Sequence, residues 1–244
     1  PTGIDEAGAK GDFSILSLPS SWHLDAGYYL RFYSVVPQWV TIGGLGQDVA
    51  HARSRLKSLE GAISGEISYD LPHRWRVACG IVLNTFAGTG GYQCFDPDPR
   101  LSLTHMFGQG SFTFHAGRYH QYLHQVGFSD IGMSSNFKIA STSGIHPQES
   151  FTFGMAGAMR PLDCLSLNID LYYKTVENQP EYLGAVLDIL NAGYRAEDYI
   201  FATKGYNFGG SVSACLEAGA FTAMASYAYC HARRRMPGEP APFS

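Results

Sequence analysis

Two histidines, His120 and His124, have the spacing in this sequence that most readily suggests a metal site. They stand four positions apart in GRYHQYLHQ, residues 117–125. On a helix this spacing puts both imidazoles on one face, where they can share a zinc ion. On a strand, with a rise of about 3.3 Å per residue, they lie about 13 Å apart, which no single metal spans. The element that carries the pair therefore decides its chemistry.

Motifs for catalysis or cofactor binding are missing from the sequence. It holds neither the GxSxG motif of a nucleophile elbow nor a phosphate loop of the GxxxxGKS type. Its five cysteines form no CxxC pair and no Cys/His cluster with zinc spacing. Two pairs have the chemistry to activate water on a barrel rim, His23 with Asp25 and His146 with Glu149, but their spacing does not single them out. We predict no enzyme activity, no cofactor and no metal site.

A two-residue alternation of apolar and polar residues is the clearest structural signal. In LSLNIDLYYK, residues 165–174, one face carries Leu, Leu, Ile, Leu and Tyr, and the other carries Ser, Asn, Asp, Tyr and Lys. Stretches of about ten residues match a tilted strand that crosses a bilayer, whereas strands of soluble proteins usually have about five or six. The same alternation recurs in residues 62–71, 74–83, 111–120, 150–159, 211–217 and 220–229.

The alternation predicts an all-β fold, an antiparallel up-and-down transmembrane β-barrel segment of about ten strands. Residues 1–25 are expected to be an N-terminal segment or loop, and residues 26–244 a partial outer-membrane barrel without a plug domain. Short turns and long connections alternate strictly, as in outer-membrane barrels. The long connections are expected near 46–60, 86–99, 122–149, 176–205 and 232–244. The expected strands are 26–35, 38–45, 61–70, 74–86, 99–107, 111–121, 150–160, 165–175, 206–217 and 220–231.

Strand geometry answers the question that the histidines raise. GRYHQYLHQ continues the strand that starts at Ser111, so the pair forms no zinc site, and both residues are expected at the lumen or rim. In a lipid-facing barrel the apolar face points outward and the polar face lines the lumen. Aromatic residues near strand ends are expected to form an interfacial girdle, namely Tyr69, Trp75, Tyr173 and Tyr229.

The composition excludes some function classes and leaves others open. Charged residues make up 16% and the net charge is −4, so no nucleic-acid partner is expected, because such proteins usually carry a basic field. No run of about 18 apolar residues exists to span a membrane as a helix. Two alternatives to an outer-membrane transporter stay open: a small ten-stranded outer-membrane barrel with a rim enzyme activity, and a soluble carbohydrate-binding β-sandwich.

Two segments outside the regular alternation have expected roles of their own. Residues 180–201 contain four apolar residues at helical spacing, which predicts a short helix over the barrel mouth for gating, ligand capture or loop packing. The basic run HARRR, residues 231–235, is expected at the mouth of the last loop, where it is solvated or contacts lipopolysaccharide phosphates. The four apolar residues are Leu183, Val186, Leu187 and Leu190.

Three segments, taken in order, resemble the barrel of TonB-dependent outer-membrane receptors, of the Bacteroidetes type with a carboxypeptidase-regulatory-like extension. PDPRLSLTHMFGQGSFTFHAGRYHQYLHQ, residues 97–125, looks like a central barrel segment of the family. The likeness continues through SGIHPQESFTFGMAGAM, residues 143–159, and LSLNIDLYYKTVENQPEY, residues 165–182. It covers about residues 60–240.

The resemblance implies uptake of a scarce ligand such as a siderophore, vitamin, glycan or peptide through a plugged barrel of about 22 strands. The implied partners are the plug domain and remaining barrel strands, the TonB complex, membrane lipid with lipopolysaccharide, and a surface lipoprotein. The sequence departs from the family by showing no plug, no TonB-contacting box and no terminal strand, so it is expected to be about half a barrel. Four residues on the expected lumen face are predicted to contact the ligand or the plug, unless they only pair with one another: Arg118, His120, Asp170 and Lys174.

Overall fold

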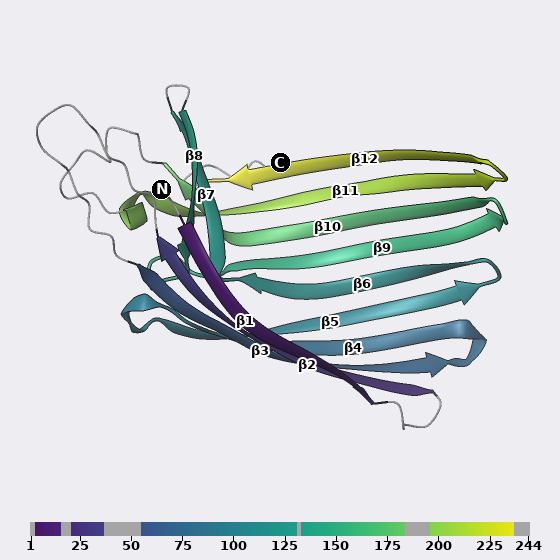
Figure 1. Cartoon of the computed structure of the whole chain (residues 1–244), viewed down its shortest axis with the longest axis horizontal. Helices are drawn as coiled ribbons and strands as arrows, with labels where there is room; N and C mark the ends of the chain where they lie inside the picture. Colours follow the sequence, from purple (N-terminus) through teal and green to yellow (C-terminus); the bar gives the residue numbers. More distant parts are fainter. Residues whose placement is uncertain (1–2, 16–20, 37–54, 131–132, 184–195, 237–244) are drawn as a thin grey trace, which may run out of the picture.

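One antiparallel sheet of ten strands makes up most of the protein (Figure 1). The structure is a computed structural model and describes residues 3–15, 21–36, 55–130, 133–183 and 196–236. Neighbouring strands follow the order of the chain, except that β6 pairs with β9. In sheet order the strands are β1 (Gly3–Ile15), β2 (Trp22–Val36), β3 (Leu56–Leu71), β4 (Trp75–Ala87), β5 (Gln93–Phe107), β6 (Gly110–Gln121), β9 (Gln148–Leu162), β10 (Leu165–Tyr182), β11 (Ile200–Ala218) and β12 (Phe221–Arg235).

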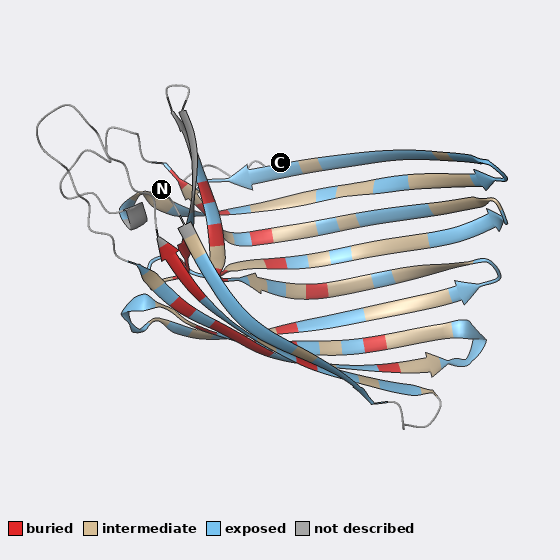
Figure 2. Cartoon of the chain, in the orientation of Figure 1, coloured by how far each residue is buried: buried red, intermediate tan, exposed pale blue. Residues whose placement is uncertain are grey.

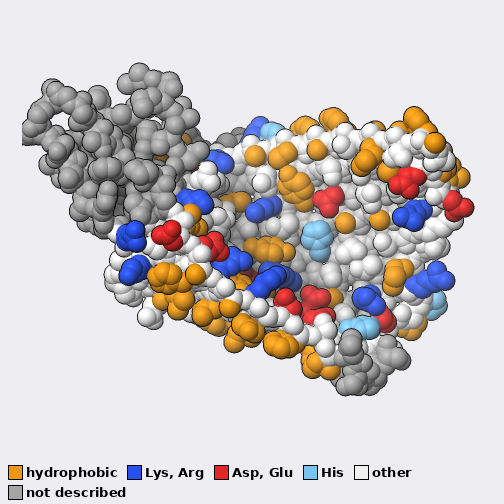
Figure 3. All heavy atoms as spheres, viewed as in Figure 1, with side chains coloured by type: hydrophobic (Ala, Val, Ile, Leu, Met, Phe, Trp, Pro, Cys, Tyr) orange, Lys and Arg blue, Asp and Glu red, His pale blue; other side chains and the backbone are white. Residues whose placement is uncertain are grey.

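The two faces of the sheet differ in polarity because apolar and polar side chains alternate along each strand. On β3, Ile63 and Ile67 are 67% and 44% exposed, while Glu60 and Ser68 on the other face are 8% and 9% exposed. Figure 3 shows charged side chains spread over the hollow face turned to the viewer, with hydrophobic side chains along its curved margin. The sheet therefore presents its apolar rows outward and its polar rows inward, as a membrane barrel wall does.

The predicted all-β, antiparallel up-and-down fold is confirmed. Nine of the expected strands overlap nine strands of the sheet. The tenth, at 38–45, lies outside the described residues. The prediction of a segment or loop at residues 1–25 is wrong for its larger part, because β1 and the start of β2 lie there and pair from Gly3–Val36 to Ile15–Leu24. Each strand of the main sheet has 12 to 19 residues.

The connections at the two ends of the sheet differ, with one departure from the predicted alternation. Short turns join β3 to β4, β5 to β6, β9 to β10 and β11 to β12 at one end, which we name the short-turn rim. The opposite end, the hairpin rim, carries the connections from β6 to β9 and from β10 to β11. The predicted long connection at 86–99 is wrong, because β4 and β5 are separated only by residues 88–92, where Gly90 and Gly91 both have φ of 82°.

A second, two-stranded sheet lies inside the connection that was expected to be a long loop at 122–149. It consists of β7 (Leu123–Asp130) and β8 (Met133–Ala140). This hairpin stands at the hairpin rim and runs across the direction of the main strands (Figure 1). β8 contacts β2 and β7 contacts β10, although those two strands are far apart in the sheet order. The hairpin therefore bridges distant parts of the curved sheet.

The buried residues concentrate toward the hairpin rim (Figure 2). One apolar cluster there joins Val126, Ile139, Ile145 and Tyr182, so the hairpin packs on the end of β10. A second cluster joins Phe86, Tyr122 and Ala140. Three short 3₁₀ turns complete the described chain: η1 (Pro72–Arg74), η2 (Thr89–Gly91) and η4 (Ala196–Tyr199). In this part of the chain no helix is long and apolar enough to cross a membrane.

Candidate functional site

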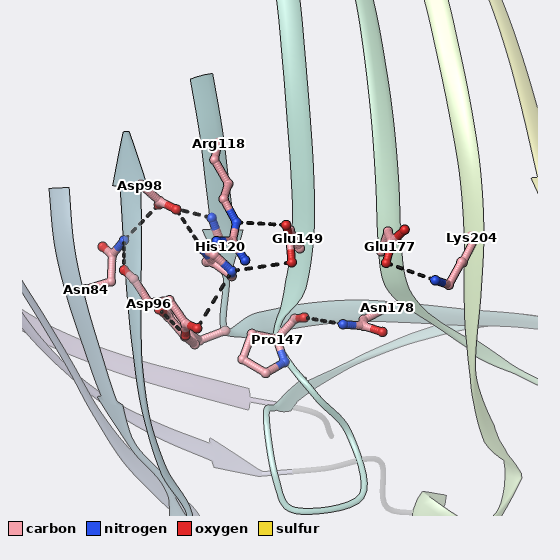
Figure 4. Close-up of polar contacts among 11 residues, drawn as sticks. Asn84, Asp96, Asp98, Arg118, His120, Pro147, Glu149, Glu177, Asn178 and Lys204 are labelled. Carbon is pink, nitrogen blue, oxygen red and sulfur yellow. Dashed lines mark hydrogen bonds and ion pairs between the residues drawn. The ribbon is translucent and has the colours of Figure 1, made fainter. Parts of the chain in front are cut away.

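A cluster of polar side chains ties the strand ends together at the hairpin rim (Figure 4). It draws on β4, β5, β6 and β9, and Tyr122 joins it from the base of the hairpin. We name this set the rim cluster: Asn84, Asp96, Asp98, Arg118, His120, Tyr122 and Glu149.

The sequence FDPDPR at residues 95–100 creates the space that the cluster fills. The β5–β6 ladder ends at Arg100–Gly117, and Pro99 is the next residue of β5 toward the hairpin rim. Proline has no N–H to donate to a neighbouring strand, so Pro97 and Pro99 cannot extend a ladder on that side. β5 still pairs with β4 as far as Gln93. A gap therefore opens between β5 and β6 near the rim.

Asp98 replaces the missing ladder in that gap. Its carboxylate accepts a hydrogen bond from the backbone N–H of His120 at 3.1 Å and contacts the ring Nδ1 of His120 at 2.6 Å. Asn84 Nδ2 donates to the same carboxylate at 2.8 Å. Asp98 is only 3% exposed, and a buried carboxylate is tolerated when donors surround it in this way. One aspartate thus joins β4, β5 and β6.

His120 and Arg118 connect this arrangement to β9. Arg118 Nε forms an ion pair with Glu149 Oε1 at 2.8 Å. The Nε2 atom of His120 lies 3.8 Å from Asp96 and 3.9 Å from Glu149, beyond hydrogen-bond distance from either carboxylate. The imidazole therefore sits among three carboxylates and is hydrogen-bonded to one of them.

The network also extends across β2 and β3. Tyr29 donates to Glu60 at 2.8 Å and lies 3.2 Å from Asn84 Oδ1. Tyr33 donates to the second oxygen of Glu60 at 2.9 Å. Because Asn84 also contacts Asp98, a continuous chain of hydrogen bonds runs from β2 to β6. Networks of this kind are stabilising when each buried member has a partner.

Tyr122 fastens the hairpin to the cluster. Its ring stacks on Phe86 with centroids 5.0 Å apart and planes 5° apart. Its hydroxyl donates to Asp96 at 2.9 Å. Burial, together with the nearby Asp96 carboxylate, raises the pKa of Tyr122. The phenol therefore stays protonated and keeps donating at physiological pH.

His124, the second histidine of the opening motif, is a buried part of the hairpin. The main strand ends at Gln121 and β7 begins at Leu123, so the two histidines lie on different strands, and the prediction of one continuous strand is wrong. His124 is 2% exposed, and its Nε2 lies 3.0 Å from the hydroxyl of Ser141. Burial lowers the pKa of His124 from 6.5 to about 4.

We expect the hairpin to loosen as the pH falls from 7 to 4. His124 takes up a proton near pH 6.5 in the unfolded chain but only near pH 4 in the folded chain. The stability that the neutral histidine gives the fold above pH 6.5 is therefore lost as the pH falls from 6.5 to about 4. The loss is on the order of 3 kcal/mol for the shift from 6.5 to about 4. Hydrogen exchange of the β7–β8 amides, corrected for intrinsic rates, measures it.

Matched variants separate this effect from other titrations. His124→Leu should remove the hairpin's pH dependence, whereas His73→Leu, at an exposed position on the short-turn rim, should leave it intact. Equal protection of the wild-type hairpin at pH 4.5 and pH 7 would contradict the expectation.

Further polar contacts join β9, β10, β11 and β12 at the hairpin rim. Asn178 donates to the carbonyl of Pro147 at 3.4 Å, and Lys204 pairs with Glu177 at 2.9 Å (Figure 4). Arg234 pairs with Glu181. The run HARRR at 231–235 therefore belongs to the end of β12, and its predicted place in a loop is wrong. Contact of this run with lipopolysaccharide stays a prediction.

The structure separates the four predicted contact residues into two groups. Asp170 lies on the polar face, in a hollow of about 250 Å³ that Asn168 and Ser213 also line. Lys174 is on the same face, but four residues along a strand span about 13 Å, so it does not pair with Asp170. Arg118 and His120 belong to the rim cluster instead. Contact of any of the four with a ligand or a plug stays a prediction.

The register places Arg118 and His120 on the outward parity of β6, although the His120 ring contacts Asp98, which lies opposite the buried Val82. Their predicted place on the lumen face stays a prediction. Cross-strand partners in an antiparallel sheet lie on one face, and Arg118 is opposite the outward residue Phe151. Phe114, which is exposed on the outward face, is separated from Arg118 and His120 by even numbers of residues along β6 and so has the same parity. The charges are tolerated on this parity because they lie at the end of the strand, where Glu149 pairs with Arg118.

The structure also bears on the two proposed rim pairs and on the expected helix. Neither proposed rim pair forms, because His23 contacts Asp70 and Glu149 pairs with Arg118. Of the expected helix, only Leu183 is described, directly after β10; Val186, Leu187 and Leu190 lie outside the described residues. Sequence reasoning missed several members of the network, although the alternating Asp-Pro-Asp-Pro pattern was a signal for two of them. The missed residues are Tyr29, Tyr33, Glu60, Asn84, Asp96, Asp98 and Tyr122.

The rim cluster is suited to holding strands together and not to covalent chemistry. Its carboxylates accept hydrogen bonds from neighbouring strands, and its buried groups are engaged with one another. Within the ranges that the structure covers, no group of three or more His, Cys, Asp or Glu residues is arranged to hold a metal ion. Surfaces open to a ligand lie on the polar face instead, including a second hollow of about 300 Å³ lined by Asp12, Asp25, Glu66 and Arg100.

Comparisons with known proteins show the fold. No protein-family model matches the chain, and no curated protein matches it. The chain is similar to the FrpB iron transporter from Neisseria meningitidis (F3-3 variant), with a TM-score of 0.68 and 12% identity, covering 95% of this chain and 36% of that one. It is also similar to the copper transporter OprC, with a TM-score of 0.64 and 13% identity, covering 95% and 38%.

A third solved structure gives the same result. The siderophore receptor PirA from Acinetobacter baumannii matches with a TM-score of 0.62 and 12% identity, covering 93% of this chain and 36% of that one. The chain thus spans somewhat more than a third of the length of these solved structures. At such low identity the likeness establishes a shared fold, the β-sheet wall found in these transporters and receptors.

Proposed function

We propose that the chain is part of the barrel of a TonB-dependent outer-membrane receptor that takes up a scarce ligand. The observation that carries the proposal is the single curved sheet of long strands, with large apolar side chains exposed on one face and polar side chains on the other. Hydrocarbon is the environment that such an exposed apolar face fits, and a water-filled or plugged lumen is the one that the polar face fits.

The proposal includes the parts of a receptor that the fold match suggests. The polar face would meet a plug domain, further strands would complete the wall, and the TonB complex would supply energy from the inner membrane. The matched structures are an iron transporter, a copper transporter and a siderophore receptor, which supports a metal chelate as ligand; a vitamin, glycan or peptide is the alternative. The Bacteroidetes type, its N-terminal extension and a surface lipoprotein belong to the same proposal.

The proposed mechanism involves binding and passage and no covalent chemistry. A ligand bound among the outer connections would pass along the polar face once the plug moves. Asp170 in its hollow and the acidic residues Asp12, Asp25 and Glu66 in the other are the inner-face groups that would meet the plug or the passing ligand. The rim cluster would keep the mouth of the wall in shape during this passage.

Neither alternative function gains support from the geometry. A soluble β-sandwich would seal its apolar rows between two stacked sheets, whereas Ile63 is 67% and Phe153 is 52% exposed on one face of a single sheet. A rim enzyme would need His146 to face Glu149, and Glu149 is engaged with Arg118. We therefore propose a transport role without enzyme activity.

Phase partition tests the membrane part of this proposal. The full chain, produced with an outer-membrane export signal and extracted in a phase-separating detergent, is expected in the detergent-rich phase, because its exposed apolar rows bind detergent. A soluble β protein of similar size in the same tube is the control for the aqueous phase. Recovery of the folded chain in the aqueous phase would overturn the proposal.

A further inference from the structure

The short-turn rim contains a notch that the proposed transport role does not use. The notch has a volume of about 520 Å³ and lies between the β3–β4 turn and the β5–β6 turn. Arg74 and Trp75 line it from the first turn, and Phe107, Gly108 and Gly110 line it from the second. A hollow of this size accommodates a small polar group.

The charge at the notch is positive. Asp70, which also lines it, accepts hydrogen bonds from Arg76 at 2.5 and 3.0 Å, so this carboxylate is already paired. Arg74 is exposed and makes no hydrogen bond or ion pair within the residues the structure describes. His73 stands beside it in the turn. The cation available to a ligand is therefore Arg74, and the complementary ligand is an anion.

The backbone of this turn displays two side chains where glycine is usual. His73 and Arg74 both have φ of 62°, in the left-handed region that residues with a Cβ rarely adopt. The β5–β6 and β11–β12 turns place Gly108 and Gly219 at positive φ. The β3–β4 turn thus holds a histidine and an arginine at the mouth of the notch in spite of the conformational cost.

An aromatic cluster places the notch at the depth of lipid headgroups. Trp75 packs on His105 with centroids 4.4 Å apart and on Phe112 at 5.8 Å. Phe112 in turn contacts Phe114 at 5.6 Å, away from the turn. Trp75 pairs with the outward Leu71, so the cluster lies on the apolar face. Aromatic side chains in such bands sit at the boundary between headgroups and hydrocarbon.

We propose that the notch binds the phosphate of a phospholipid headgroup. Arg74 holds the phosphate, and the acyl chains extend over Trp75, Phe112 and Phe114 on the apolar face. The inference rests on the proposed outer-membrane location, since only an embedded chain brings this rim against lipid. A lipid phosphate fits better than a free anion because the cation and the apolar surface adjoin.

Native mass spectrometry of the full chain in detergent tests this site. The probes are a phosphatidylglycerol, the diacylglycerol with the same chains, and glycerol phosphate without chains. Phosphatidylglycerol should be retained, and the other two should not. Arg74→Gln should reduce its retention about fivefold, the effect of removing one arginine beside an anionic headgroup. Arg160→Gln is the matched control, because Arg160 is exposed near the same rim and does not line the notch.

The outcomes separate this inference from the proposed function. Equal retention in Arg74→Gln and the wild type, equal loss in both arginine variants, or equal binding of glycerol phosphate would overturn the lipid site. Far-UV circular dichroism must show both variants folded; if Arg74→Gln does not fold, Arg74→Lys, which keeps the charge, should retain the lipid and Trp75→Ala should lose it. A chain that enters the detergent phase without specific lipid retention refutes only this site, whereas recovery in the aqueous phase refutes the proposed function.

Discussion

Replacing Ile169 by arginine is expected to destabilise the chain in a bilayer by about 2–4 kcal/mol, the cost of an arginine on the lipid face of a barrel near the midplane. Ile169 is the central residue of the apolar row from Leu165 to Tyr173 on β10, is 43% exposed, and lies between Gly157 of β9 and Val212 of β11. All three belong to the outward face, where water cannot hydrate the new charge. Urea unfolding of the chain in lipid vesicles, followed by tryptophan fluorescence, measures the change.

The adjacent residue provides the control. Asn168 lies on the polar face, and among the residues that the structure describes its side chain makes only a long hydrogen bond of 3.5 Å to Ser213. Asn168→Arg should change stability by less than about 0.5 kcal/mol, as surface substitutions usually do. The same two substitutions in a water-soluble wall would both be mild, because Ile169 is already exposed there. A penalty equal for both sites, or larger at Asn168, would therefore contradict the assignment of faces.

Asp98→Ala is expected to cost about 3–5 kcal/mol, the range measured when one partner of a buried charged pair is removed. The substitution leaves the backbone N–H and ring of His120 and the amide of Asn84 without their shared acceptor. Asp98 is 3% exposed, so water does not readily replace it. Denaturant unfolding gives the free energy, and hydrogen exchange at residues 118–121 shows whether the loss is local.

A second aspartate tests whether the effect is specific to the cluster. Asp163 lies in the exposed β9–β10 turn at the opposite rim. Asp163→Ala should stay within about 0.5 kcal/mol of the wild type. Similar stability of the Asp98 and Asp163 variants would show that the gap between β5 and β6 does not depend on the carboxylate.

The strands that were predictable from the sequence are those with complete apolar rows. In β10 every second residue from Leu165 to Tyr173 is large and apolar, and in β9 the row from Phe151 to Met159 is apolar with one glycine, so both the elements and their faces follow from the alternation. β1 was not predictable in this way. Its sequence, GIDEAGAKGDFSI, carries Gly, Ala and Asp where an apolar row would stand, and only Phe13 and Ile15 are large and exposed. Its pairing with β2 is a tertiary effect that propensity does not encode.

The rim cluster could not be predicted from the sequence for a related reason. Prolines within FDPDPR suggested a loop, although prolines fit a strand on the side where it has no ladder. Partners such as Asn84, Asp98 and His120 are separated by 14 to 36 positions, and only the register of the sheet brings them together. Along β6, Phe112 and Phe114 occupy even-numbered positions of the outward face, and Arg118 and His120 occupy even-numbered positions too. The alternation in the sequence therefore already assigned both residues to the same face as the two phenylalanines.

The bridging hairpin has a mechanical consequence. The β7–β8 hairpin contacts β2 and β10, the second and the eighth strand of the ten-stranded sheet. Because the hairpin has a fixed length, it fixes the distance between these two strands and with it the curvature of the sheet between them. Lengthening β7 and β8 together would flatten the wall at that end, and shortening them would tighten it. The width of the curved sheet at the hairpin rim is thus determined by a hairpin that is not part of that sheet.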